Sequence, residues 1–165
     1  MAKLVVPPGN VPRSCGGRSS ARNHTVITGG VAAIGSFELR GVTTGPVTVF
    51  QESTYAPGDG VWRWMGSIAM DKKGNMALGL SASNANIHPQ IRYVGRLATD
   101  PINTLSGEMH LLDGAGSQQD TVNRWGDYSA MAIDQVDQHT FWYTTEYYDT
   151  TSSFNWRTRI GNFHF

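Results

Sequence analysis

The sequence has a single cysteine, no long apolar run and no excess of charge of either sign. One cysteine, Cys15, cannot form an intramolecular disulfide or a thiolate metal cluster. A bilayer-spanning helix needs about 20 consecutive apolar residues, and no such window is present. The 13 basic and 13 acidic residues balance, so the chain lacks the positive field that attracts nucleic-acid phosphates. We expect neither a nucleic acid nor a membrane as its partner, whereas zero net charge makes association between copies easy.

Motifs for metals, phosphates and export are missing as well. The five histidines lie far apart, in no ligand spacing. The stretch "SCGGRSS" at 14–20 lacks the Lys-Ser/Thr ending of a phosphate-binding loop. Pro7 and Pro8 cut the N-terminal apolar run far short of a signal-peptide core. We therefore predict no metal, no cofactor and, in the chain as written, no export signal; the cellular location stays open.

Period-two patterning dominates the sequence, and helical periodicity is nearly absent. Ten short segments alternate apolar and polar residues and are separated by Gly, Pro, Asn, Asp and Ser, as in β-strands joined by turns. The length fits one domain over 1–165. The fold class predicted is all-β. The predicted strands are 22–28, 34–40, 47–53, 66–71, 75–83, 89–97, 107–113, 128–134, 140–148 and 156–165.

Three patterns recur at about 60 residues, a spacing typical of repeat folds. Val-x-Arg-Trp occurs at 61–64 and again at 122–125. Two hairpin aspartates, Asp71 and Asp134, lie 63 positions apart (134 − 71). An aliphatic-Gly-x-hydrophobic signature occurs at 34–37, 94–97 and 160–163. Together they indicate a repeating unit with about four strands.

A unit of this size matches a propeller blade. The sequence predicts about three propeller-type blades of four antiparallel strands, over 1–60, 61–121 and 122–165, with "KLVV" at 3–6 as the strand that completes the last. Propellers have at least about four blades, so three cannot close a ring. A homodimer would close a six-bladed ring, which makes a second copy of the chain the expected partner.

Four stretches, "VWRWMGSIAMDKKGNMALGLSAS", "HPQIRYVGRLATDP", "NRWGDYSAMAID" and "TFWYTTEYYDTTSSFNWRTRIGNF", resemble the C-terminal part of large secreted bacterial sialidase-like repeat β-propeller proteins. The resemblance covers roughly residues 22–165 and implies the fold more than an activity, because those proteins are mostly of unproven function. They are longer and exported, so this chain looks like a piece of one. The turn "DKKGN" only approximates a sialidase Asp-box, and Asp71 is interpreted as a turn-former.

Asp127 and Glu146 are the best pair of carboxyl groups for glycosidase chemistry, which needs two. Glu146 stands among aromatic residues that could raise its pKa by desolvation. Arg63 and Arg124 occupy matching positions of the repeated motif. They could grip a carboxylate bidentately, or each could pair with a nearby Asp and hold blades together.

Aromatic residues offer a second kind of site, because their rings provide stacking faces for sugars. Trp62 replaces a polar residue of the repeat and is the best candidate for an exposed ligand-binding face. Tyr143 and Tyr147 flank Glu146 and are further ligand-binding candidates. Trp64 and Trp125 are expected to fill the core between blades.

Three functions remain open. The favoured one is a non-catalytic β-propeller module that binds carbohydrate or a surface, because no catalytic signature is complete. One alternative is a sialidase-like glycoside hydrolase that acts through Asp127 and Glu146 with the arginine pair. Another is a structural fragment that self-assembles without a specific ligand.

Overall fold

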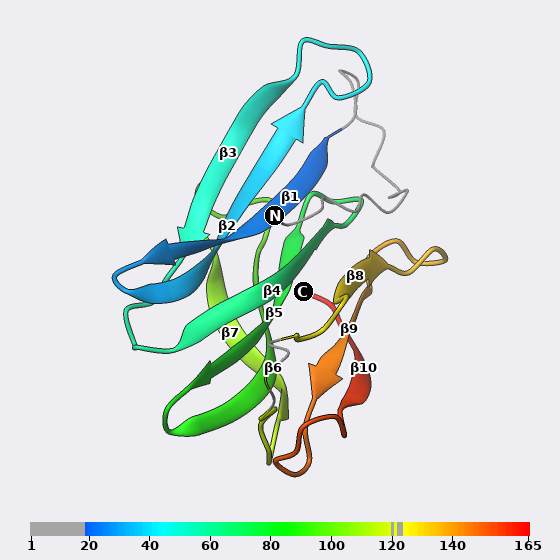
Figure 1. Ribbon diagram of the computed structural model, residues 1–165. Coiled ribbons are helices and arrows are strands. Elements are labelled where there is room, and N and C mark those ends of the chain that lie inside the picture. The colour runs from blue at the N-terminus through cyan, green and yellow to red at the C-terminus, as the bar shows by residue number, and fades with distance from the viewer. Residues whose placement is uncertain (1–18, 120, 122–123) are drawn as a thin grey trace.

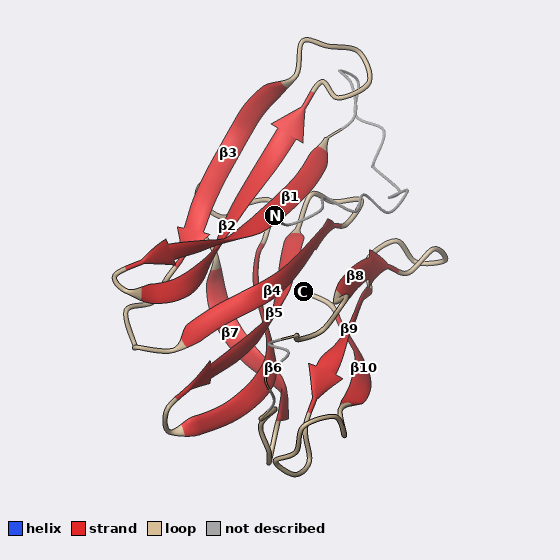
Figure 2. Cartoon of the chain, viewed as in Figure 1, coloured by secondary structure: helices blue, strands red, loops and turns tan. Residues whose placement is uncertain are grey.

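The computed structural model describes residues 19–119, 121 and 124–165. In this part of the chain there are ten β-strands and no helix, and so no helix long and apolar enough to cross a membrane. Figure 2 shows strands joined by loops alone. Each strand overlaps one of the ten segments whose period-two patterning predicted it, so the prediction of an all-β fold is confirmed.

The strands form three antiparallel, blade-like sheets that follow one another along the chain (Figure 1). Sheet I has the order β1-β2-β3: β1 (Ser20–Thr28), β2 (Val31–Arg40) and β3 (Thr48–Tyr55). Sheet II has the order β4-β5-β6-β7: β4 (Trp62–Met70), β5 (Met76–Asn84), β6 (Ile87–Arg96) and β7 (Ser106–Asp113). Sheet III has the order β10-β9-β8: β8 (Ala130–Ile133), β9 (Phe141–Tyr147) and β10 (Arg157–Phe163).

The prediction of four strands per blade holds for sheet II alone. Sheets I and III have three described strands each, and β1 and β10 each pair with a single neighbour. The "KLVV" segment expected to complete the last blade lies outside the described residues, as do Cys15 and the first two residues of the second Val-x-Arg-Trp motif.

Sheet II lies between the other two sheets. Successive side chains of β5 point in opposite directions, so this strand contacts sheet I on one face and sheet III on the other. Leu78 and Leu80 pack against Ile34 of sheet I in one apolar cluster. On the other face, a Cβ at Gly79 would lie 2.5 Å from the ring of Tyr143 in sheet III. The missing side chain of Gly79 thus makes room for the Tyr143 ring, and sheet III packs closely on sheet II.

The repeated aliphatic-Gly signature falls on β2, β6 and β10, but its glycines do not occupy equivalent places. A Cβ at Gly95 would meet Phe165, near the C-terminal end of sheet III, whereas one at Gly161 would face Leu111 of sheet II. A Cβ at Gly35 would meet His24, the partner across its own sheet. The signature therefore recurs on one strand of each sheet, but its glycine faces a different kind of neighbour in each copy.

Asp71 closes the β4–β5 turn, as predicted. Its Oδ1 accepts hydrogen bonds from the backbone N–H of Lys73 at 2.8 Å and of Asn75 at 2.9 Å. Gly74 has a φ of +88°, a conformation that glycine adopts at little cost. The Asp71 carboxylate also lies 3.3 Å from Nδ1 of His139, in the β8–β9 turn, so the turns of sheets II and III touch.

Candidate functional site: an aromatic hollow at the edge of sheet II

Strand alternation separates the residues of the first Val-x-Arg-Trp motif onto two faces of β4. Trp62 pairs across to Ser83, and Trp64 to Ser81. The two indoles therefore share a face, and Arg63 between them points to the other. Arg63 faces sheet I, together with its cross-strand partner Ala82, and is only 2% exposed, whereas Trp62 on the other face is 49% exposed.

The indole face opens on a hollow of about 360 Å³ that is open to solvent. Its lining comes from β4 and from the end of β5 with the turn that follows. The lining residues are Trp62, Trp64, Ser83, Asn84 and Ala85. Two flat aromatic surfaces with an amide and a hydroxyl beside them make a site of mixed apolar and hydrogen-bonding character.

The amide of Asn84 is held in one orientation by the turn. Its Oδ1 accepts the backbone N–H of Asn86 at 2.8 Å and that of Ile87 at 3.1 Å. No described residue accepts a hydrogen bond from its Nδ2, so this group is available as a donor to a ligand in the hollow.

Trp125, from the second copy of the motif, supports the hollow from behind. Its ring meets Trp64 edge-on at 6.0 Å between centroids and stacks on Tyr148 at 5.6 Å. Its Nε1–H donates to Oγ of Ser81 at 3.1 Å. The two repeated tryptophans therefore pack against each other. Both are half-buried, whereas the sequence predicted that they would lie in the core.

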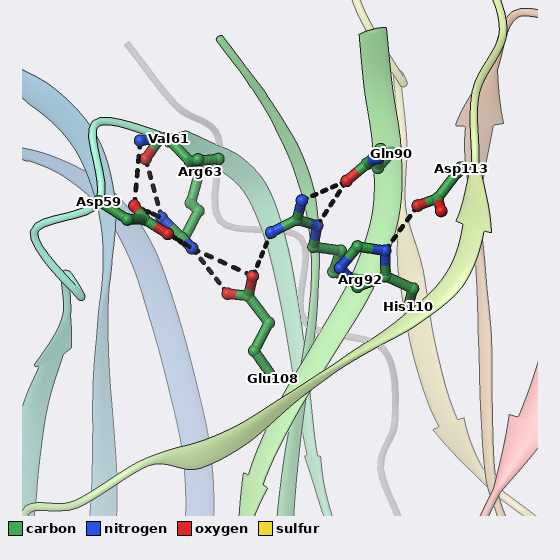
Figure 3. Close-up of polar contacts among 8 residues, drawn as sticks. All are labelled: Asp59, Val61, Arg63, Gln90, Arg92, Glu108, His110 and Asp113. Carbon is green, nitrogen blue, oxygen red and sulfur yellow. Dashed lines mark hydrogen bonds and ion pairs between the residues drawn. The ribbon is translucent and has the colours of Figure 1, made fainter. Parts of the chain in front are cut away.

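The opposite face of β4 carries an ion cluster between sheets I and II (Figure 3). Arg63 uses all five of its N–H donors: two go to Asp59, at 2.8 and 2.9 Å, and two to Glu108, at 2.7 and 3.1 Å. The fifth goes to the carbonyl oxygen of Val61 at 2.9 Å. Arg92 pairs with the same Glu108 carboxylate.

The cluster shifts the pKa values of its members. Hydrogen bonds from Arg63 lower the pKa of Asp59 to about 2. Burial alone would raise the pKa of Glu108, but hydrogen bonds from Arg63 and Arg92 outweigh it and hold that pKa below its ordinary range. Burial, together with the Glu108 carboxylate, raises the pKa of Tyr55. The carboxylates stay ionised, and the cluster ties Tyr55 of sheet I to sheet II.

The two arginines of the repeated motif share no partner in the described residues. Arg63 is enclosed, whereas the side chain of Arg124 is 69% exposed and pairs with Asp127, three residues further on. In this chain the two guanidinia therefore do not meet around one carboxylate, which was one of the two interpretations of the repeated motif. The surroundings of Arg63 match the alternative, in which it pairs with a nearby Asp.

Glu146 is partly buried, and only one of its two carboxyl oxygens has a hydrogen-bond partner. Its Oε2 accepts the backbone N–H of Gly126 at 2.6 Å, and its Oε1 is buried without a partner in the structure. Burial raises the pKa of Glu146. The loop before β8 places the Gly126 amide on this carboxyl, while the Asp127 carboxylate beside it is engaged by Arg124. The two carboxyl groups share no hydrogen bond in the described part of the chain.

The two tyrosines predicted to contact a ligand lie in the packing of sheet III. Tyr143 is 1% exposed, and burial raises its pKa. Its hydroxyl, near Ser129 and Thr145, has no hydrogen bond of ordinary geometry. Tyr147 is partly buried against the cluster of sheets II and III. Among the predicted site residues, Trp62 is the one that lines the hollow.

No group of three or more His, Cys, Asp or Glu side chains within the described ranges could hold a metal ion. No family model, curated protein or solved structure matches the chain. The resemblance to sialidase-like propellers therefore stays a prediction.

The Asp59–Arg63 pair gives the protein an acid-sensitive contribution to stability. Because the folded-state pKa of Asp59 lies below its unfolded value, this contribution is complete above about pH 4 and is lost as the pH falls towards about 2. Asp59→Asn should remove roughly 1 kcal/mol of it, a modest amount because Asp59 is partly exposed and solvent screens the pair. Urea unfolding between pH 5 and 2, at about half-unit steps, measures the difference.

The control is Glu52→Gln, which removes an exposed carboxylate from β3. As the pH falls, the free energy of unfolding of the wild type should decrease more steeply than that of Asp59→Asn. The control variant should show the same pH dependence as the wild type. Equal slopes in the wild type and Asp59→Asn would contradict the role given to the pair.

Glu146 should act in the opposite direction. Since its folded-state pKa is raised, the free energy of unfolding falls as the pH rises from about 4.3 through that pKa. Glu146→Gln has no charge to bury and keeps an acceptor for Gly126. It should match the wild type near pH 4 and exceed it in stability at pH 7, whereas exposed Glu52→Gln should show no such divergence. A loss of stability at pH 7 would show that the ionised carboxylate is needed.

Proposed function

We propose that the chain is a non-catalytic module that binds carbohydrate in the hollow beside Trp62. The observation that carries the proposal is a half-exposed indole on a hollow with a second indole and an oriented amide. The C–H face of a sugar ring packs on the electron-rich face of an indole. Its hydroxyl groups can bond the Asn84 amide and the Ser83 hydroxyl at the rim.

The lining of the hollow favours binding over turnover. Glycoside hydrolysis needs a carboxyl group on each side of the scissile bond, or a specialised nucleophile. The five residues that line the hollow include no carboxylate. The Glu146 carboxyl is engaged by the Gly126 amide, and Asp127 is paired with Arg124. A sugar bound beside Trp62 would therefore be held and released unchanged.

Trp62→Ala should weaken carbohydrate binding on the order of 30-fold, since loss of a central tryptophan contact costs about 2 kcal/mol or more. A glycan array identifies the strongest oligosaccharide, and titration calorimetry compares the wild type with the variant. Trp156→Ala removes another exposed indole, before β10, and should bind as the wild type does.

Three results would contradict this proposal. Unchanged affinity in Trp62→Ala would place the site elsewhere. Turnover of aryl glycosides that is lost in Glu146→Gln would support the glycoside hydrolase instead. Silence of the wild type on the array would leave a structural fragment that assembles without a specific ligand.

We further propose that a second copy of the chain packs on the end sheets. Sheets I and III have three described strands each, and they end the series of packed sheets. Tyr143 of β9 points into sheet II, so the neighbouring Trp142 points away from it, and Ile160 lies on that same outer face by its register. Trp142 is 39% exposed and Ile160 is 66% exposed. A two-fold pair would cover these faces and give a ring of six blades.

Sedimentation or light scattering should therefore give twice the 18.0 kDa mass of the chain. Ile160→Glu should shift the mass towards the monomer, because it places a charge in the proposed contact. Ile102→Glu, at an exposed position between β6 and β7, should leave the dimer intact. A wild-type protein that stays monomeric at high micromolar concentration would rule out the ring.

A further inference from the structure

We infer that the hollow beside Trp62 selects uncharged sugars and discriminates against carboxylated ones, such as sialic and uronic acids. The inference rests on the proposed binding of carbohydrate in this hollow and names the class of sugar. It is carried by the charges around the site.

None of the five residues that line the hollow carries a charge. Proteins hold a carboxylate with a guanidinium or ammonium group, and most firmly with a bidentate arginine. The hollow offers the neutral Asn84 amide and the Ser83 hydroxyl, which suit a sugar hydroxyl and give a carboxylate no compensating charge.

Arg63 is next to both indoles in the sequence but serves the other face of β4. All five of its donors are used, and its side chain is 2% exposed. Turning it towards the hollow would take its donors from Asp59 and would leave the largely buried Glu108 to Arg92 alone. Its charge is therefore already balanced by Asp59 and Glu108 and is not available to a ligand in the hollow.

Arg124 lies beside Trp125, which packs on Trp64 at the back of the hollow. Its guanidinium is exposed, but it is paired with the Asp127 carboxylate, so the two together present no net charge. The second arginine of the repeated motif is neutralised in turn.

The indoles add a repulsive contribution of their own. The face of an aromatic ring is electron-rich, so it attracts the C–H groups of a sugar and repels an anion placed over it. A cationic ligand would find this face favourable, but the lining has no carboxylate to hold the cation. An uncharged sugar is the ligand that meets no opposing group.

The test uses matched pairs of glycans, each a neutral oligosaccharide and the same oligosaccharide with a terminal sialic or uronic acid. The pair whose neutral member gives the strongest array signal is titrated against the wild-type chain. The neutral member should bind at least about tenfold more tightly. Its affinity should not change between about 0.05 and 0.5 M NaCl, since no ionic contact is made.

A gain-of-function variant tests the same point from the other side. Ala85 is an exposed residue of the lining, in the β5–β6 turn. Ala85→Lys should raise the affinity for the carboxylated member about threefold to fivefold, and salt should reverse the gain. Ala85→Gln, similar in length and uncharged, should leave both affinities as in the wild type.

Two outcomes overturn the inference while carbohydrate binding stands: tighter, salt-sensitive binding of the carboxylated member by the wild type, or no gain in Ala85→Lys. If a quaternary ammonium compound bound more tightly than any glycan, the ligand of the hollow would be a cation and not a sugar. Failure of every glycan to bind overturns the proposed function itself, and so separates the two.

Discussion

The fold depends on β5 presenting two apolar faces at once. Leu78 and Leu80 point to sheet I, and Ala77 and Gly79 point to sheet III, so one strand supplies the centre of two separate cores. A one-residue shift in its register would exchange these faces. Large residues would then stand where the Tyr143 ring needs the space above Gly79. Both interfaces, and every group placed by them, follow from this alternation.

The same alternation on β4 places the aromatic rings and the charged group of the motif on opposite faces of the strand. The indoles of Trp62 and Trp64 lie towards solvent and sheet III, and the guanidinium of Arg63 lies between sheets I and II. A charge that a ligand could have used is enclosed by Asp59 and Glu108, while apolar rings that could have filled a core remain partly exposed. The hollow is neutral because Arg63, which lies between the two tryptophans in the sequence, is bound by Asp59 and Glu108 on the opposite face of β4.

The sequence predicted the strands and the Asp71 turn well, because alternation and turn chemistry are local properties. It also singled out Trp62 as an exposed ring. It could not give the phase of the repeats: a bulge between Trp64 and Ser67 shifts the register of β4, and the glycine signatures point in different directions. The partner of Arg63 was equally out of reach, since Glu108 lies 45 residues further along the chain and meets it only through the pairing of sheet II. Asn84 was missed as well, although it follows directly on the predicted strand 75–83.

The two interfaces of sheet II are built from different materials. The contact with sheet I combines an aliphatic cluster with Tyr55, which meets the Glu108 carboxylate of the ion cluster, whereas the contact with sheet III is aromatic, with Tyr93 stacked on Phe163 at 3.7 Å and the Tyr143 ring over Gly79. Ionic contacts yield to protons, and aromatic packing does not. Sub-global opening of this protein in acid should therefore begin at the contact with sheet I, where protonation of Asp59 and Glu108 removes the groups that hold Arg63, whereas the contact with sheet III, which also contains the Asp71–His139 pair, keeps its stacked rings.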